Sequence, residues 1–411
     1  MKVEDINMKK QIVAIMLGAT MLLTAGCGAS DKASTEQTNE TQANETQTDE
    51  AQSTEAAGEE SGVSSAQMGV VPSEHVSELC DYSAVPISLS AVYEPSTENI
   101  QNVEMDLLNS YGLGSKEVSD RTTVQDGDYV KVDYTGYQNG EAFSGGTATD
   151  VLIDVSNNKD AEKGTGYITG FSDGLIGAEV GSTISSDVTF PEDYGVDSLN
   201  GQTVTFEFVV KGIYTPIGLD EVEDSAIADQ FGATYGINDK STLEDFVKQY
   251  IESNRYSALV SQIKDYVVKN STYDIPEDYL KARLSEYEDI YEQTYCTDGQ
   301  TLEEYFQDNY SMSLDEAEEQ LLSILNEQIG VEFAFSVIAD KEAIEMNEDE
   351  YAAYVQNFLS NDSLNFNSEE EVYEYFGAGN AADGETYLRN LYLVNKAIDH
   401  VADNAVVTYT E

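Results

Sequence analysis

The spacing of the apolar residues changes near Pro216, and this change limits the possible folds more than any other feature of the chain. Before it, stretches such as "YVKVDYTGYQ" and "TVTFEFVVKGIY" alternate apolar and polar residues, the period of two that is typical of strands. After it, apolar residues recur every three or four positions, as in amphipathic helices. The sequence therefore predicts an α+β chain, with a strand-rich domain over residues 124–214 and a helical domain over residues 215–411.

The strand-rich domain contains a segment without alternation, "YITGFSDGLIGAEVG", from Tyr167 to Gly181. Its glycines fit neither the dinucleotide fingerprint nor the phosphate loop, because the required spacing and the Gly-Lys-Ser/Thr sequence are missing. We predict a close turn and one short helix here, which carry Ile168 and Phe171 onto the concave side of the sheet. Periodicity alone favours a plain core role for both residues.

The flanking sequence predicts the strands of this sheet. Val130, Val132 and Tyr134 fall on one face of the first strand, and Asn139-Gly140 predicts a hairpin turn after it. "VLIDV" and "TISSDVTF" add further strands.

Composition restricts the partners and the chemistry. The chain carries 78 acidic and 20 basic residues, a formal net charge of −58 at pH 7. Such a field repels phosphate backbones, so nucleic acid is a poor partner. With two histidines, imidazole catalysis and histidine-rich metal sites are nearly excluded, and we expect neither a metal nor a cofactor.

The first 27 residues are arranged like a secretory signal. Lys9 and Lys10 precede the apolar run "QIVAIMLGATMLL", which is short for a membrane span and is followed by "TAGC". This ending resembles the bacterial lipoprotein signal, although Thr24 stands where that family more often has leucine. The resemblance implies lipidation of Cys27 and attachment to the extracytoplasmic face of the cell membrane; an ordinary signal peptide is the alternative. The acidic "MKVED" indicates that translation starts at Met8.

Two connecting regions separate this signal from the strand-rich domain. Residues 28–72 are polar, acidic and without period, so we predict a disordered tether. Residues 73–123 predict a lead-in strand and a short amphipathic helix after "PSTE". Cys80 and Cys296 are interpreted as two free thiols; a disulfide between them is the alternative, and spacing alone does not decide between the two.

Capping boxes, in which serine or threonine is followed three residues later by glutamate, predict helix starts in the second half. They are Ser241 with Glu244, Thr301 with Glu304, Ser313 with Glu316, and Ser368 with Glu371. Pro276 is predicted in the first turn of another helix. The helix at Ser241 carries an apolar stripe of Leu243, Phe246, Val247, Tyr250 and Ile251. Such stripes more often form a bundle core than a binding surface.

Four motifs of the strand-rich domain occur in the order and spacing of one enzyme family. "VDYTG" with "GEAF", then "YITGFSDGLIGAEVG", "VTFPEDYG" and "GQTVTFEFVV" resemble the FKBP-type peptidyl-prolyl isomerases over residues 126–213. The resemblance implies an antiparallel half-barrel sheet around one short helix. It also implies a pocket formed by Tyr134, Phe143, Ile168, Phe171, Tyr194 and Phe206. Three features depart from the family: Ser144 where drug-binding members have aspartate, Phe171 where many have tryptophan, and the polar loop "NNKDAEKGTG".

The implied chemistry is rotation about an X-Pro amide bond, which crosses a barrier of about 18–20 kcal/mol because conjugation is lost. A water-poor aromatic pocket favours the twisted amide, which is less charge-separated than the planar one. By the resemblance, the Ile168 N–H and the Tyr194 hydroxyl hold peptide carbonyls while proline lies over Phe171. This reaction needs no acid, base, metal or cofactor.

A second resemblance covers the helical domain. "TFPEDYGVDSLNGQ" is similar to the isomerase domain of trigger factor, and "LDEVEDSAIADQFG", "DIPEDYLKARLSEYE" and "NAVVTYTE" resemble its C-terminal domain over residues 219–411. The resemblance implies helical arms that cradle unfolded chains. The ribosome-docking domain of trigger factor has no counterpart here, so ribosome binding is not expected.

We therefore expect a membrane-tethered isomerase and chaperone that assists the folding of exported proteins with X-Pro bonds. The main alternative is a non-catalytic, peptide-binding holdase with a degenerate FKBP domain, which Ser144 and the polar loop favour. A solute-binding lipoprotein is a third class, but it needs a two-lobed α/β body that this pattern does not predict.

Overall fold

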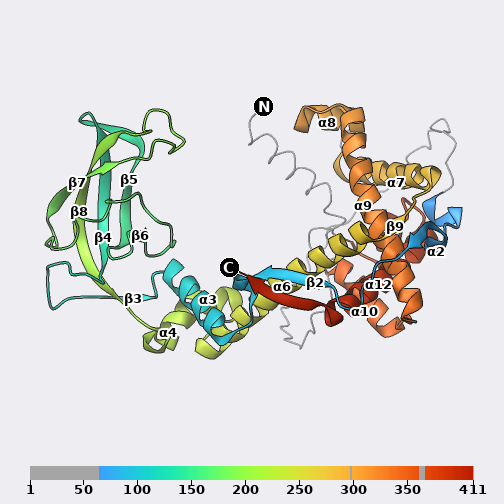
Figure 1. The fold of residues 1–411 in the computed structure, drawn as a ribbon, viewed down its shortest axis with the longest axis horizontal. Helices are drawn as coiled ribbons and strands as arrows, with labels where there is room; N and C mark the ends of the chain where they lie inside the picture. Colours follow the sequence, from blue (N-terminus) through green and yellow to red (C-terminus); the bar gives the residue numbers. More distant parts are fainter. Residues whose placement is uncertain (1–63, 297–298, 361–365, 411) are drawn as a thin grey trace, which may run out of the picture. The chain divides into compact units, whose positions relative to one another are not determined.

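The computed structural model describes residues 64–296, 299–360 and 366–410 (Figure 1). Its contacts divide the chain into two compact units. Of the described residues, the sheet unit comprises Ser90–Arg255 with 409–410, and the helical unit comprises 64–89 together with those of Tyr256–Thr408. Cys27, Met8 and the predicted tether up to residue 63 lie outside the described residues.

The sheet unit contains a six-stranded antiparallel sheet in the order β3-β8-β4-β5-β6, with β7 also paired to β8 (Figure 1). Its strands are β3 Ser115–Glu117, β4 Tyr129–Gln138, β5 Glu141–Asp154, β6 Lys159–Asp160, β7 Thr183–Thr189 and β8 Thr203–Pro216. Asn139 and Gly140 join β4 to β5 with φ of 53° and 85°, which confirms the predicted hairpin turn. The β4–β5 register shifts between Val132 and Tyr134, a bulge of the kind that bends a strand.

Alternation along the strands collects the apolar side chains on one face of the sheet. Val130 and Val132 are fully buried, and Tyr134 packs against the same core, as predicted. On β8, the buried side chains are Val204, Phe206, Phe208, Val210 and Ile213. This face is the core of the strand-rich domain and supports the candidate site.

Residues 167–181 form a series of turns, so the predicted short helix in this segment is wrong. The Phe171 N–H donates a hydrogen bond to the Ile168 carbonyl at 3.1 Å, which closes a single turn. Gly170 and Gly177 have φ of 88° and 87°, a left-handed conformation that interrupts a right-handed helix and that glycine adopts readily. The glycines end each turn before a helix can propagate.

Helices complete the sheet unit, and they begin with α3 (Thr97–Ser110), which confirms the predicted lead-in helix. The hydroxyl of its N-cap residue Ser96 accepts a hydrogen bond from the Asn99 N–H at 3.2 Å. The other helices are α4 Asp224–Ile227, α5 Ala233–Tyr235 and the first half of α6 Lys240–Asn270. A separate buried cluster forms between α3 and α6 from Ile100, Leu108, Leu243, Val247 and Ile251.

The start of α6 differs from its prediction. Ser241 lies inside the helix, and the Asp239 carboxylate accepts the Thr242 N–H at 2.8 Å in place of the predicted capping box. The predicted apolar stripe is buried only in part, because Phe246 is 38% exposed and Tyr250 is 56% exposed. An exposed aromatic edge therefore runs along this helix.

The helical unit packs long helices around the central helix α9 and contains two small strand pairs, so it is not purely helical. Its helices are α2 Pro72–His75, the second half of α6, α7 Glu277–Tyr295, α8 Leu302–Tyr310, α9 Leu314–Lys341, α10 Glu348–Leu359, α11 Glu369–Phe376 and α12 Ala381–Asn404. The strand β1 (Val76–Glu78) pairs with β9 (Thr272–Tyr273), and β2 (Pro86–Ser90) pairs with the closing strand β10 (Val406–Thr410).

Two of the predicted capping boxes in the helical unit are confirmed, at Thr301 and at Ser313. The third is half formed: the Ser368 hydroxyl accepts the Glu371 N–H, but the Glu371 carboxylate accepts the N–H of Asn367 at 2.7 Å. Among the described helices, α9 is long and apolar enough to cross a membrane by length and composition, but 67% of its apolar window is buried inside the protein. It is the core helix of this unit.

Residues 64–72 are part of the folded helical unit, so the predicted disordered tether extends too far at this end. Ser65, in the short helix η3 (Ser65–Met68), donates from its N–H and its hydroxyl to the two carboxylate oxygens of Glu286, at 2.6 and 2.7 Å. Ser65 is 8% exposed, and two charge-assisted hydrogen bonds hold it against α7. Cys80 and Cys296 are both free thiols.

Candidate functional site

Five of the six predicted pocket residues meet on one side of the sheet, and we call them the aromatic cluster. Tyr134 comes from β4, Phe143 from β5, Phe206 from β8, and Ile168 and Phe171 from the glycine-rich turns. The ring centroid of Phe171 lies 5.1 Å from that of Tyr134 and 4.8 Å from that of Phe206, both edge to face. The Phe143 and Phe206 rings also meet edge to face, at 5.9 Å. These geometries are the favourable ones for aromatic pairs.

The members of the aromatic cluster differ in burial. Phe171 and Phe206 are 3% and 5% exposed and form its inner part. Three half-buried residues border solvent: Tyr134, Phe143 and Ile168. Ser144, the departure from the drug-binding members, is exposed on β5.

Tyr194, the sixth predicted residue, lies at the edge of the cluster. Its side chain is 45% exposed, and its ring contacts Phe190 at 4.5 Å. Phe190 in turn contacts Phe143 at 6.2 Å, so it links Tyr194 to the cluster. Sequence reasoning missed Phe190, although it lies inside the quoted motif "VTFPEDYG". In the described parts of the chain, the Tyr194 hydroxyl has no hydrogen-bond partner, so it is available to a ligand.

Two glycines let Phe143 lie across the backbone of β4 and β5. A Cβ added at Gly136 would lie 2.5 Å from Phe143 and 2.7 Å from Phe206, and one added at Gly146 would lie 2.7 Å from Phe143. Real Cβ atoms do not approach other atoms this closely. Both glycines are therefore part of the site, and the sequence analysis did not single them out.

Tyr167 is the most consequential residue that the sequence analysis left out of the site. Its ring stacks on the Phe171 ring, with centroids 4.4 Å apart and planes inclined by 22°. Its hydroxyl donates a hydrogen bond to the buried Asp160 carboxylate at 3.4 Å, and burial raises the pKa of this phenol. Tyr167 therefore covers one face of the Phe171 ring, over which the sequence analysis placed a proline ring.

The polar loop "NNKDAEKGTG" supports the turn that holds Ile168. The Asn158 side chain donates to the carbonyls of Tyr167 and Ile168, at 3.1 and 2.9 Å, and accepts the Ser172 N–H at 3.1 Å. Asp160 accepts backbone N–H groups within its own loop. No described residue accepts a hydrogen bond from the Ile168 N–H, so this donor is free for a ligand. The loop that departs from the family pattern thus fixes the backbone of the site.

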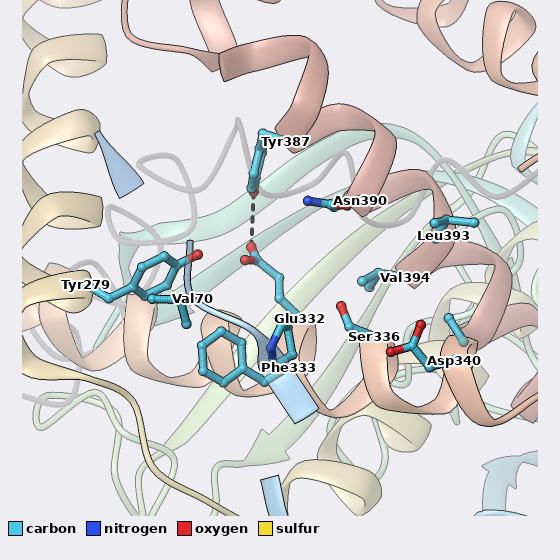
Figure 2. Close-up of a pocket in the computed structure, with 12 residues that line it drawn as sticks. Val70, Tyr279, Glu332, Phe333, Ser336, Asp340, Tyr387, Asn390, Leu393 and Val394 are labelled. Atoms are coloured by element: carbon cyan, nitrogen blue, oxygen red, sulfur yellow. Dashed lines mark hydrogen bonds between the residues drawn. The ribbon is translucent and has the colours of Figure 1, made fainter. Parts of the chain in front are cut away.

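The helical unit contains a cavity of about 220 Å³ (Figure 2). Val70 from the amino-terminal segment, Tyr279 of α7, Phe333 of α9 and Tyr387 of α12 line it together with Glu332. Figure 2 shows the Tyr387 hydroxyl pointing at the Glu332 carboxylate, to which it donates a hydrogen bond at 3.1 Å.

Glu332 belongs to a buried ionic network at this cavity. The Arg283 guanidinium donates to both of its carboxylate oxygens, at 2.7 and 3.1 Å. Gln328 donates a further hydrogen bond at 3.0 Å, and the Arg283 guanidinium lies 4.9 Å from the ring centroid of Tyr387. Every partner of this carboxylate is already in place, so the network has a structural role.

A carboxyl group on α7 predicts a pH dependence of stability. Burial raises the pKa of Glu288 to about 7, and repulsion from Glu318 adds to the effect. The folded protein therefore binds a proton on Glu288 more tightly than the unfolded chain does. The stability that this proton contributes is fully present below pH 4.5 and is lost as the pH rises through 7. Glu288→Gln should therefore be about 1–2 kcal/mol more stable than the wild type at pH 8, a value discounted because water screens this half-exposed group.

Urea denaturation at pH 4.5 and pH 8 measures this difference. The exposed residue Glu319 on α9 offers a matched control, because Glu319→Gln should change stability equally little at both pH values. An equal effect of Glu288→Gln at both pH values contradicts the assigned titration.

Within residues 64–296, 299–360 and 366–410, no group of three or more histidine, cysteine, aspartate or glutamate side chains could hold a metal ion.

Two protein families match separate parts of this chain. The model of FKBP-type peptidyl-prolyl cis-trans isomerases matches residues 120–211, which include the whole aromatic cluster. The model of the bacterial trigger factor protein C-terminus matches residues 240–403.

Similar proteins are trigger factors. That of Sinorhizobium medicae is 27% identical over 336 residues, which cover 80% of this chain and 63% of the relative. That of Syntrophomonas wolfei is 22% identical over 355 residues, covering 85% of this chain and 75% of the relative. A solved trigger factor chaperone structure aligns with 79% of this chain and 72% of its own length, with a TM-score of 0.34 and 15% identity.

The chain spans less than two thirds of the length of the Sinorhizobium medicae relative and three quarters of the Syntrophomonas wolfei relative. Both family matches nevertheless lie in one polypeptide, in the order isomerase and then C-terminal domain. The chain is thus similar to trigger factors, with a match to the FKBP-type isomerase family over residues 120–211 followed by a match to the trigger factor C-terminus over residues 240–403.

Proposed function

We propose that this protein is a peptidyl-prolyl cis-trans isomerase and chaperone that assists the folding of exported polypeptides. The observation that carries the proposal is the aromatic cluster, which lies inside the matched isomerase domain. Its rings border solvent at Tyr134 and Phe143, so a peptide can reach them.

The cluster suits amide rotation because it offers a water-poor surface to the X-Pro bond. A planar amide is stabilised by charge separation, whereas the twisted amide has lost its conjugation. Rings that exclude water disfavour the planar form relative to the twisted one, and each 1.4 kcal/mol of this preference raises the rate about tenfold. No proton transfer is required.

Two free donors can orient the peptide on this surface. The Ile168 N–H is unused within the protein, and the Asn158 side chain fixes the turn that presents it. The Tyr194 hydroxyl is a second unused donor, and Phe190 links its ring to Phe143. A peptide carbonyl on either donor would hold the chain while the proline ring contacts the cluster.

Tyr167 sets a requirement for this mechanism. Because its ring stacks on Phe171, it must leave that face when a proline ring binds there. The same stacking is the observation that favours the alternative, a holdase whose isomerase fold binds peptide without catalysis.

The chaperone activity is assigned to the region from residue 219 onward. Tyr235, Phe246 and Tyr250 expose aromatic surface at α5 and α6, and the Tyr235 and Phe246 rings lie 6.2 Å apart. Exposed apolar surface of this kind is suited to unfolded chains.

The substitution Phe206→Ala distinguishes catalysis from binding. It removes the ring that contacts Tyr134, Phe143 and Phe171, so we expect at least about a tenfold loss of isomerisation rate on a proline peptide. Suppression of aggregation of a denatured test protein should persist.

Tyr194→Phe should lower the isomerisation rate less than Phe206→Ala does, because it removes one hydroxyl and keeps the ring. The protein tested should begin at Gly28, so that it keeps the contact between Ser65 and Glu286.

Loss of a buried phenylalanine can itself cost about 3–5 kcal/mol of stability, so each variant must first be shown to be folded by circular dichroism. Phe231→Ala is a matched control, because Phe231 is equally buried but lies in the cluster between α3 and α6. It should lower stability and leave the isomerisation rate unchanged. A wild-type chain without isomerisation above background, or a folded Phe206→Ala variant with full activity, would replace the enzyme by the holdase.

We further propose that lipidated Cys27 anchors the protein at the extracytoplasmic face of the cell membrane. The support is the sequence "LTAGC" after an apolar run. This location accounts for the choice of exported polypeptides as clients.

A further inference from the structure

Another cavity, of about 490 Å³, lies between α3 and the start of α6 within the sheet unit. Its volume falls in the range of small-ligand sites. Ile100 and Leu219 contribute apolar surface, and Glu104, Glu244 and Lys248 contribute charge. These residues are distinct from those of the aromatic cluster.

Glu104 is the unusual member of this cavity. It is 2% exposed, and it lies one turn after Ile100 and one turn before Leu108 on the buried face of α3. Within the described residues, no side chain or backbone N–H donates a hydrogen bond to its carboxylate, and no basic group lies within 4.0 Å of it. Burial raises the pKa of this carboxyl, and the neighbouring Glu244 adds to the effect.

The basic residues of the cavity already have other partners. The Lys248 ammonium lies 2.7 Å from the Glu244 carboxylate, one turn away on α6. The Lys240 ammonium lies 3.0 Å from Asp224. Lys248 attracts Glu104 only from a longer distance, and this is the smallest of the three influences on the carboxyl. Each of these lysine charges is neutralised by its own carboxylate partner. The Glu104 carboxylate is therefore the charge of the cavity that has no ion-pair partner among the described residues.

A buried carboxylate without a partner is unfavourable, and native proteins seldom contain one that a ligand or another group does not satisfy. A positively charged partner suits this carboxylate best, because Glu104 and the neighbouring Glu244 both repel an anion there. It must also be slender and partly apolar, because Ile100 and Leu219 line the same space.

We infer that this cavity binds an ammonium or guanidinium group on an aliphatic stem, whose charge pairs with Glu104 and whose methylene groups lie against Ile100 and Leu219. Two sources share this chemistry: a lysine or arginine side chain of a polypeptide, and a free polyamine. The inference does not depend on isomerase activity, since the cavity and the aromatic cluster have no residue in common.

The test uses the chain from Gly28 and two pentapeptides, acetyl-Ala-Ala-Lys-Ala-Ala-amide and the same peptide with norleucine in place of lysine. Isothermal titration calorimetry at 150 mM salt, which screens the general attraction of a protein with a charge of −58, measures their affinities. We expect the lysine peptide to bind at least about tenfold more tightly, equivalent to 1.4 kcal/mol. Spermidine serves as the free-polyamine probe.

Glu104→Gln keeps the shape of the side chain and removes its charge, so it should abolish the preference for lysine over norleucine. It should also raise the melting temperature of the ligand-free protein, whereas a merely structural Glu104 predicts an unchanged or lower value. Asp106→Asn is the matched control, because Asp106 is exposed on the same helix, and it should retain the preference.

The outcomes separate the two sources. Binding of the lysine peptide in a Glu104-dependent way identifies a polypeptide side chain, and Glu104-dependent binding of spermidine alone identifies a free polyamine. Equal affinity for the two peptides together with no Glu104-dependent spermidine binding overturns the inference. The comparison of the two peptides needs only the wild-type protein, and the spermidine comparison needs a folded Glu104→Gln variant.

Discussion

Glu332→Gln should lower the free energy of unfolding by about 3–5 kcal/mol, as large a stability loss as we expect from the removal of a buried phenylalanine. Arg283 is 3% exposed, and its ion-pair partners among the described residues are the carboxylates of Glu332 at 2.7 Å and Glu286 at 3.8 Å. Glutamine keeps the hydrogen bonds from Tyr387 and Gln328 in reach but leaves the buried guanidinium with only the longer contact to Glu286, which also accepts a hydrogen bond from Ser65. Urea denaturation at pH 7 measures the loss.

The loss of stability should come from the Arg283 charge, which has lost its closest carboxylate, and not from a change in side-chain shape. The double variant Arg283→Met with Glu332→Gln should therefore be more stable than Glu332→Gln alone, because it removes the buried cation. Glu319→Gln on the exposed side of the same helix should change stability by less than about 0.5 kcal/mol. If the double variant is no more stable than the single one, the network contributes through packing and the ionic explanation is wrong.

Local features of the fold could be predicted from the sequence because short-range rules determine them. The change of period near Pro216, the Asn139-Gly140 turn and the caps at Thr301 and Ser313 each depend on residues that are close in the chain. The capping box predicted at Ser241 is wrong, and the cause is also local: Asp239, two residues earlier, is an equally good N-cap residue.

Other features depend on contacts between distant residues, and no local rule predicts them. The short helix expected within residues 167–181 is replaced by turns, which Asn158 from the preceding loop fixes through its hydrogen bonds to Ile168 and Ser172. The tether was expected to continue to residue 72 because its composition is polar, yet Glu286 binds Ser65 across 221 residues of sequence.

The candidate site shows the same division. Alternation and motif resemblance placed Tyr134, Phe143 and Phe206 correctly on neighbouring strands. The stacking of Tyr167 on Phe171 was not predicted, because alternation gives the face of a side chain but not the direction of its ring. The unpaired acid at Glu104 was equally invisible, since a glutamate on an amphipathic helix is ordinarily assigned to the exposed face.

Cys27→Ser should move nearly all of the protein from the membrane fraction to the soluble fraction, if lipidated Cys27 is the anchor that we propose. Each methylene of an acyl chain that enters the bilayer contributes about 0.8 kcal/mol, and two chains hold stably where one binds reversibly. With 78 acidic and 20 basic residues, the protein gains nothing from anionic headgroups, so electrostatic attraction cannot replace the lost chains. Release should therefore be complete even at low salt.

The other two cysteines provide matched controls, because Cys80 and Cys296 are free thiols within the described fold. Cys80→Ser and Cys296→Ser should remain in the membrane fraction, and mass spectrometry of the wild type should find the acyl chains on the peptide that begins with Cys27. Release must also be shown not to result from unfolding, by an unchanged melting temperature of the soluble variant. A Cys27→Ser protein that has lost the apolar run of residues 11–23 and still stays in the membrane fraction would refute the lipid anchor, because neither charge nor the buried helix α9 offers another means of attachment within the described residues.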